Sequence, residues 1–291
     1  MRRTPLLAFA VLLVAAACAK SQTSTAPSPT HEAMKSEGTM KSGEGMMMKM
    51  PAYADAFHAS FTTPDDGVRV TDNSLNVSVK TTGFTPRCDL AGKFDQAGIG
   101  HYHLLLDKVL VNMFCTSQAS VSMQNVRPGM HTLEVVPALN EHDEVMKNGQ
   151  TIKFDYEPTS PLPVITGETR SGSPSIQILS PRSGDTVTGT FDIKVKITGF
   201  ENSCNLFGKP DVAGYGHWHA NLDTTTGAMM GMGAGKNGKG GMLGMSCTDT
   251  FRASTAGLGS GETHTLFALL VGNSHAPLNP AVMDKVDVKI G

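Results

Sequence analysis

Eight of the ten histidines in this chain fall into two equivalent groups of four. The groups are His101, His103, His131 and His142, and His217, His219, His264 and His275. Each group begins with two histidines separated by one residue, and on a β-strand such a pair projects from one face. Imidazole nitrogens are good ligands for copper, zinc and nickel ions. Each group therefore predicts a metal site with three or four nitrogen ligands. The alternative is a hydrogen-bonded network that serves only the fold.

The two groups belong to an internal duplication. The pattern Gly-x-Gly-His-x-His, followed four residues later by Asp, occurs at 98–107 and again at 214–223. The offset of 116 residues between the copies is constant from 75 and 191 to Asp107 and Asp223. The aspartate and the next cysteine are 8 positions apart in the first copy and 24 positions apart in the second. The second copy therefore carries 16 additional residues. Because both copies retain all four histidines, a shared chemical role is favoured over chance.

The aspartate of each copy, Asp107 or Asp223, lies four residues beyond the second histidine of the pair. Four residues of strand span about 13 Å, so direct ligation of the same ion would require a bend. We therefore expect these aspartates to orient an imidazole from outside the ligand set or to stabilise the fold.

Methionine is concentrated before the first repeat and in the insertion of the second. The residues that could recruit a soft metal are Met46, Met47, Met48, Met50, Met229, Met230, Met232, Met242 and Met245. Thioether sulfur suits Cu(I), so methionine beside histidine favours copper as the ion, with zinc as the alternative. A low-complexity linker whose methionines bind nothing is an equal interpretation of the first tract.

The N-terminus predicts export. Arg2 and Arg3 precede a short apolar run that is too short to span a membrane, and the run ends in Ala-Ala-Ala-Cys18. This ending resembles a lipobox, with ordinary signal cleavage as the alternative. We expect a signal peptide at 1–17, a lipid-anchored Met-rich tether at 18–63, and a location in the cell envelope, facing the periplasm or the exterior.

The remaining four cysteines occur two per repeat at matched positions. In an oxidising compartment the simplest pairing is Cys88 with Cys115 and Cys204 with Cys247. Thiolate ligation of a metal is the less favoured alternative, because neither pair forms a Cys-x-x-Cys motif.

Alternating apolar and polar residues predict β-strands at 75–81 and 191–197, and 31 glycines and 16 prolines favour a turn-rich β fold. We expect two tandem all-β domains, either immunoglobulin-like or cupredoxin-like β-sandwiches. The first should occupy 64–157, a Pro-rich linker 158–175, and the second 176–291.

These segments resemble a bacterial family of exported domains of unknown function, numbered 4399. Its pattern is Gly-x-Gly-His-x-His-Leu-x-x-Asp, then Pro-Gly-x-His-Thr-Leu, then an acidic or Asn residue and a His in the next loop. It is matched at 98–107, 128–133 and 140–142 and again at 214–223, 264–266 and 273–277, although Gly-Glu-Thr replaces the Pro-Gly turn in the second copy. The resemblance implies an envelope-located β domain with metal binding, and it assigns no activity.

Several other function classes lack support. A net charge of −2 argues against a nucleic-acid partner. The Gly-rich run at 233–240 lacks the Ser or Thr of a phosphate-binding loop, so nucleotide binding is not expected, and no nucleophile elbow is present. We expect an envelope lipoprotein that binds a transition metal, first of all copper, for buffering or for delivery to a metal-accepting protein. A structural or adhesion module and a copper-dependent oxidoreductase are the alternatives.

Overall fold

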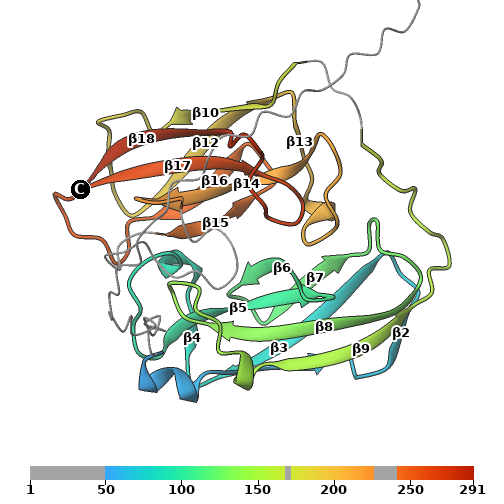
Figure 1. The fold of residues 1–291 in the computed structure, drawn as a ribbon. Coiled ribbons are helices and arrows are strands. Elements are labelled where there is room, and N and C mark those ends of the chain that lie inside the picture. Colours follow the sequence, from blue (N-terminus) through green and yellow to red (C-terminus); the bar gives the residue numbers. More distant parts are fainter. Residues whose placement is uncertain (1–49, 168–171, 226–240) are drawn as a thin grey trace, which may run out of the picture. The chain divides into compact units, whose positions relative to one another are not determined.

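The computed structural model describes residues 50–167, 172–225 and 241–291. Its regular structure consists of strands and four short 3-10 helices, and the prediction of two tandem β-sandwiches is confirmed (Figure 1). Cys18 and the methionines at 46–48, 229, 230 and 232 lie outside the described residues, as do the predicted signal peptide and most of the predicted tether. None of the helices in the described ranges is long and apolar enough to cross a membrane.

The first repeat contains nine strands in two sheets. The strands are β1 (His58–Thr63), β2 (Val68–Val70), β3 (Ser74–Thr82), β4 (Thr85–Pro86), β5 (Ile99–Leu106), β6 (Val109–Phe114), β7 (Gln118–Ser122), β8 (Gly129–Ala138) and β9 (Gln150–Tyr156). One sheet has the order β1-β3-β7. The other has the order β2-β9-β8-β5-β4, with β6 also paired to β5. The 3-10 helices are η1 (Ala52–Ala56), η2 (Cys88–Leu90) and η3 (Met146–Asn148).

The second repeat reproduces this topology strand for strand. Its strands are β10 (Ser175–Ser180), β11 (Thr186–Val187), β12 (Thr190–Thr198), β13 (Glu201–Asn202), β14 (Tyr215–Leu222), β15 (Met242–Ser246), β16 (Thr250–Ser254), β17 (Thr263–Val271) and β18 (Met283–Ile290), with η4 at Cys204–Leu206. The sheets have the orders β10-β12-β16 and β11-β18-β17-β14-β13, and β15 pairs with β14. Thus β14 corresponds to β5 and β15 corresponds to β6.

The first sandwich begins earlier than predicted. β1 pairs antiparallel with β3, and Ala54 and Phe57 are fully buried. The predicted start at 64 is therefore wrong, because the end of the predicted tether is the first strand of the fold. The burial of Phe57 against Phe84, with ring centroids 4.6 Å apart, explains why this segment is ordered.

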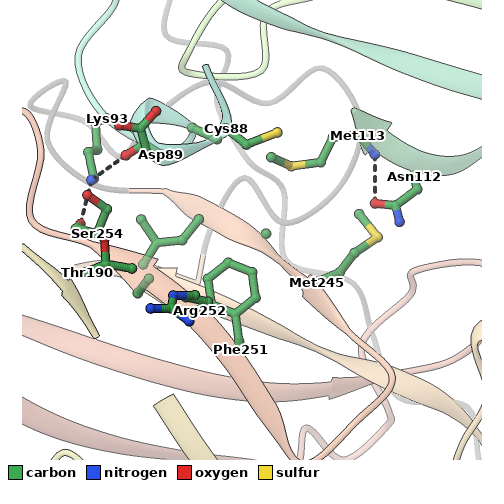
Figure 2. A pocket seen from close by; sticks show the side chains of 14 residues that line it. Cys88, Asp89, Lys93, Asn112, Met113, Thr190, Met245, Phe251, Arg252 and Ser254 are labelled. Carbon is green, nitrogen blue, oxygen red and sulfur yellow. Dashed lines mark hydrogen bonds between the residues drawn. The ribbon is translucent and has the colours of Figure 1, made fainter. Parts of the chain in front are cut away.

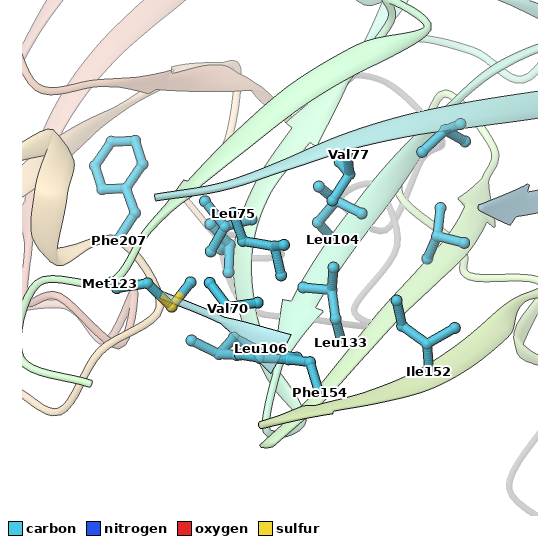
Figure 3. Close-up of a cluster of buried hydrophobic side chains, with 14 of the residues drawn as sticks. Val70, Leu75, Val77, Leu104, Leu106, Met123, Leu133, Ile152, Phe154 and Phe207 are labelled. Carbon is cyan, nitrogen blue, oxygen red and sulfur yellow. The ribbon is translucent and has the colours of Figure 1, made fainter. Parts of the chain in front are cut away.

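Each core lies between the two sheets of its repeat. Figure 3 shows Leu75, Leu104, Leu106, Leu133 and Phe154 packed together in the first of them. On β5 these core residues alternate with histidines, as the two-residue period of a strand requires. The histidine face is buried as well, so from Gly100 to Leu106 every residue of β5 is buried, and the same holds for β14.

The predicted disulfides are both present. Cys88 is joined to Cys115 and Cys204 to Cys247. In each repeat the bond links the 3-10 helix before the histidine strand to the residue that follows the next strand, β6 or β15. These cysteines are therefore structural and do not act as thiolate ligands.

Candidate metal centres

Three of the four histidines in the first repeat converge on one point. His101 and His103 project from the buried outer face of β5, and His142 reaches the same point from the loop after β8. The His101 Nε2 atom lies 3.0 Å from His103 Nε2 and 3.0 Å from His142 Nδ1, and the last two atoms are 3.4 Å apart. The three rings are at most 6% exposed.

The second repeat contains an equivalent triad. The His217 Nε2 atom lies 3.1 Å from His219 Nε2 and 2.9 Å from His275 Nδ1, and the remaining separation is 3.3 Å. In both repeats the strand histidines present Nε2 and the loop histidine presents Nδ1, so the two copies have kept the geometry as well as the residue types.

The size of each triangle matches a small metal ion. The point equidistant from the three nitrogens is about 1.8 Å from each, which is the circumradius of a triangle with sides of 3.0, 3.0 and 3.4 Å. Metal–imidazole bonds are about 2.0–2.1 Å for zinc. An ion bound by all three nitrogens would therefore lie to one side of their plane, with a further coordination position on that side.

The outer nitrogens fix two of the ring tautomers in the first triad. His103 Nδ1 donates to Glu144 Oε1 at 2.6 Å, and His142 Nε2 donates to the carbonyl oxygen of Met242 at 2.6 Å. In the neutral rings this leaves lone pairs on His103 Nε2 and His142 Nδ1, which face each other at 3.4 Å. Either a proton on His101 Nε2, which is 3.0 Å from both nitrogens, or a metal ion can lie between these lone pairs. Outer partners of this kind are typical of histidines that bind metals.

The second triad is held less completely. His275 Nε2 donates to the carbonyl oxygen of Leu110 at 2.7 Å, but the Nδ1 atoms of His217 and His219 are buried without a hydrogen-bond partner among the described residues. The position matching Glu144 is Pro277, because both residues form the bridge that follows the histidine loop. The two centres are therefore alike in their inner nitrogens and different in their outer partners.

The histidine loop is held in an unusual conformation. His142 and His275 have φ angles of 69° and 68°, in the left-handed region that residues other than glycine rarely adopt. The preceding backbone is anchored by a carboxylate in both repeats: Asp95 Oδ1 accepts from the amide of Glu141, and Asp211 Oδ1 accepts from the amide of Ser274. Backbone strain that recurs at one position of both repeats is typical of a functional site.

Burial disfavours the charged form of five of the six triad histidines. It lowers the pKa of His142 to about 3 and that of His275 to about 4, and neighbouring imidazoles act in the same direction. Desolvation also lowers the pKa of His101, His217 and His219 well below the usual value. Neutral imidazoles have free lone pairs at pH 7, which is the state that metal ligation requires.

This burial makes the metal-free protein sensitive to acid. Because the pKa of His142 and of His275 is lower in the folded chain than in the unfolded chain, the unfolded state binds more protons below pH 6.5. The free energy of unfolding should fall by about 2 kcal/mol for each of the two histidines between pH 6.5 and pH 5. Urea denaturation of the chelated protein at both pH values measures this change. In H142Q/H275Q the pH dependence should be smaller; an unchanged slope would contradict the assignment.

The fourth histidine of each group is not part of the triad. His131 Nδ1 lies 2.6 Å from Asp107 Oδ2, and His131 Nε2 donates to the carbonyl oxygen of Arg127 at 2.7 Å. His264 likewise lies between Asp223 and Glu262. Both nitrogens of each ring contact oxygen atoms outside the triad. Of the three or four nitrogen ligands predicted for each group, the structure brings three together, and His131 and His264 are not among them. Of the two roles expected for the aspartates, the structure shows contacts that stabilise the fold.

His131 and His264 provide a test of this separation. H131A/H264A should lower the free energy of unfolding by about 1–3 kcal/mol, because it removes the imidazole partners of the Asp107 and Asp223 carboxylates. The number of metal ions bound per chain should stay the same. Metal analysis and denaturation of the same preparation measure both effects. Loss of a bound ion would show that His131 or His264 contributes to metal binding.

Each centre receives a hydrogen-bond acceptor from the other repeat. His142 of the first repeat donates to Met242 of the second, and His275 of the second donates to Leu110 of the first. Gly92 and Gly208 make this approach feasible, because a Cβ atom on either would lie 2.5 Å or 2.6 Å from the same carbonyl oxygens. Phe207 adds apolar contact by packing against the core of the first repeat.

The methionines predicted as soft ligands lie in two different places. Met50 packs with the apolar cluster around Phe57. Met242 and Met245 lie on β15 and belong to a cluster with Ala91 and Met113. Met242 is 4% exposed and contributes its carbonyl oxygen to the first centre.

Comparison with known proteins gives no family. No family model matches the chain, and no curated protein does. Solved structures similar to it include the fibronectin(III)-like modules of Clostridium thermocellum CbhA, with 11% identity, a TM-score of 0.24, and coverage of 80% of this chain and 93% of that one. Another is the DIP-gamma IG1+IG2 structure, with 10% identity, a TM-score of 0.19, and coverage of 80% and 97%. TM-scores this low carry no conclusion about function.

Proposed function

We propose that the protein is a metal-binding lipoprotein of the cell envelope that holds one transition-metal ion in each repeat, first of all copper, with zinc as the alternative. The observation that carries this proposal is the inward-facing pair of lone pairs on His103 and His142, each fixed by a hydrogen bond on the far side of its ring. A cation between the rings would bind both lone pairs, and hydrogen bonds on the far side of the rings are typical of histidines that bind metals.

Binding for storage or delivery fits the site better than turnover. The six imidazoles are at most 6% exposed, so a bound ion would be shielded from solvent and from a diffusing substrate. Exchange of such an ion requires movement of the histidine loop, which suits retention and handover to a metal-accepting protein. In this proposal Cys18 anchors the chain to the membrane and the tether presents the two repeats.

A structural or adhesion module is the second candidate. It is favoured by the closed hydrogen-bond chain from Glu144 through His103, His101 and His142 to Met242, which needs no ion to be continuous. In this case the triads stabilise the contact between the repeats, and metal removal has no effect.

Metal content and stability of one preparation distinguish these functions. The mature chain, purified from the envelope fraction of an expressing bacterium, should contain about two copper or zinc ions. Their removal by a chelator should lower the melting temperature by several degrees, because an ion at 1,000 times its Kd stabilises the folded state by about 4 kcal/mol. Re-addition of one metal should restore the melting temperature. An unchanged melting temperature and no bound metal would favour the structural or adhesion module over metal binding.

A further inference from the structure

We infer that Met113 and Met245 supply a thioether sulfur as the fourth ligand of the two centres and thereby select Cu(I) over Zn(II). This inference rests on the proposed function, because it names the ion and completes the ligand set of the same sites. It depends on strand register, packing and a comparison between the two repeats.

Strand register places each methionine beside the second histidine of the pair. In the β5–β6 ladder His103 is directly opposite Met113, and in the β14–β15 ladder His219 is directly opposite Met245. Side chains opposite each other in an antiparallel pair project from the same face, with Cβ atoms about 4.5–5.5 Å apart. Both methionines therefore lie on the histidine face of their own sheet, and Met245 also packs against the core cluster of the first repeat.

The methionines approach from the side that the histidine loop leaves free. β8 occupies one edge of β5, and His142 reaches the triad from the loop after β8. β6 pairs along the other edge of β5 and carries Met113. In the second repeat β17 and β15 flank β14 in the same way. A fourth ligand from β6 or β15 would thus reach the ion from the edge of the histidine strand opposite to the histidine loop.

Packing places both methionines beside Met242, which contributes to the first centre. Met113 is buried in a cluster with Met242, whose carbonyl oxygen accepts the His142 Nε2 proton. Met245 packs against the same cluster. Figure 2 shows Met113 and Met245 lining one cavity of about 300 Å³ together with Cys88 and Phe251. The space beside both methionines leaves room for their flexible side chains to change rotamer.

The duplication distinguishes a specific role from ordinary packing. The six residues 110–115 match 242–247, and only methionine and cysteine are identical at corresponding positions. Val111 corresponds to Leu243 and Asn112 to Gly244, so packing tolerates exchange on these strands. The cysteines form the disulfides. Met113 and Met245 are retained without such a covalent reason.

The resulting donor set has a clear preference. Three neutral imidazoles and one thioether suit Cu(I), because thioether sulfur is a soft ligand. Zinc is bound by imidazole, carboxylate and thiolate, and a neutral thioether adds little to its affinity. Removal of the thioether should therefore weaken Cu(I) binding and leave Zn(II) binding nearly unchanged.

The test compares M113L/M245L with M123L in the full mature chain. Leucine conserves the volume of methionine, and Met123 is a buried core methionine that lies on neither histidine face. Cu(I) affinity is measured anaerobically against a chromophoric Cu(I) chelator with ascorbate present, and Zn(II) affinity is measured against a zinc chelator. X-ray absorption of the Cu(I) form reports whether sulfur is bound to the metal.

We expect M113L/M245L to bind Cu(I) about tenfold more weakly per site, a loss of about 1.4 kcal/mol, with Zn(II) affinity unchanged. The copper–sulfur signal should disappear in this variant and persist in M123L. An unchanged Cu(I) affinity and a persistent sulfur signal in M113L/M245L would overturn the inference and leave the histidine triads in place. If the wild-type chain binds neither ion, the proposed function fails and this inference fails with it.

Discussion

Replacement of His103 and His219 by alanine in one chain should reduce the bound metal from about two ions to none. Each substitution removes one of only three nitrogen ligands and leaves the other two lone pairs without a shared ion. H103A alone and H219A alone should each retain about one ion. The metal-dependent rise in melting temperature should be halved in the single variants and absent in the double variant.

Metal analysis and thermal unfolding with and without chelator measure this series. H131A/H264A is the matched control, since it also removes one histidine per repeat but leaves the triads intact. If H103A/H219A were less stable than wild type by the same amount with and without metal, the triads would be structural networks.

The second large effect is expected at Gly92. In G92A the new Cβ atom would lie 2.5 Å from the carbonyl oxygen of Met242, and the residue would keep a φ of +70° that alanine rarely adopts. The left-handed backbone alone costs about 1–3 kcal/mol. The collision with the second repeat adds to this cost and displaces the acceptor of His142 Nε2. We therefore expect lower stability and weaker metal binding at the first centre.

Gly98 provides the control. Its φ is +74°, but no atom lies within 4 Å of the position that its Cβ would occupy, so G98A carries the backbone cost without the collision. Chemical denaturation of both variants isolates the contact between the repeats as the difference between them. Equal free energies of unfolding for G92A and G98A would show that the contact contributes nothing.

Much of the site could be predicted because it depends on local period and on duplication. The two-residue period of a strand places His101 and His103 on one face, and the matched loop histidine indicates the third ligand. The error at His131 has a physical reason. β8 runs antiparallel to β5, so its start lies beside Leu106 and its end beside His101. One strand cannot bring residues from both of its ends to the same point.

Other parts of the site cannot be predicted from the types of the side chains. The acceptors for His142 and His275 are backbone carbonyl oxygens of the other repeat, which any residue could provide. Glu144 is an ordinary acidic residue in the sequence, and its absence from the second copy hides its role. The early start of the first sandwich was missed because a Met-rich tract precedes it and suggested that the low-complexity tether continues.

His142 donates to Met242 and His275 donates to Leu110. This reciprocal pair of hydrogen bonds has an evolutionary consequence. Contacts in which each partner offers the same surface to the other are the form taken by twofold-symmetric homodimers. Two separate single-repeat chains could satisfy every one of these contacts. Fusion of the two into one polypeptide holds their ratio at one to one and frees each half to change alone. The replacement of Glu144 by Pro277 is the kind of divergence that such a fusion permits and an identical pair forbids.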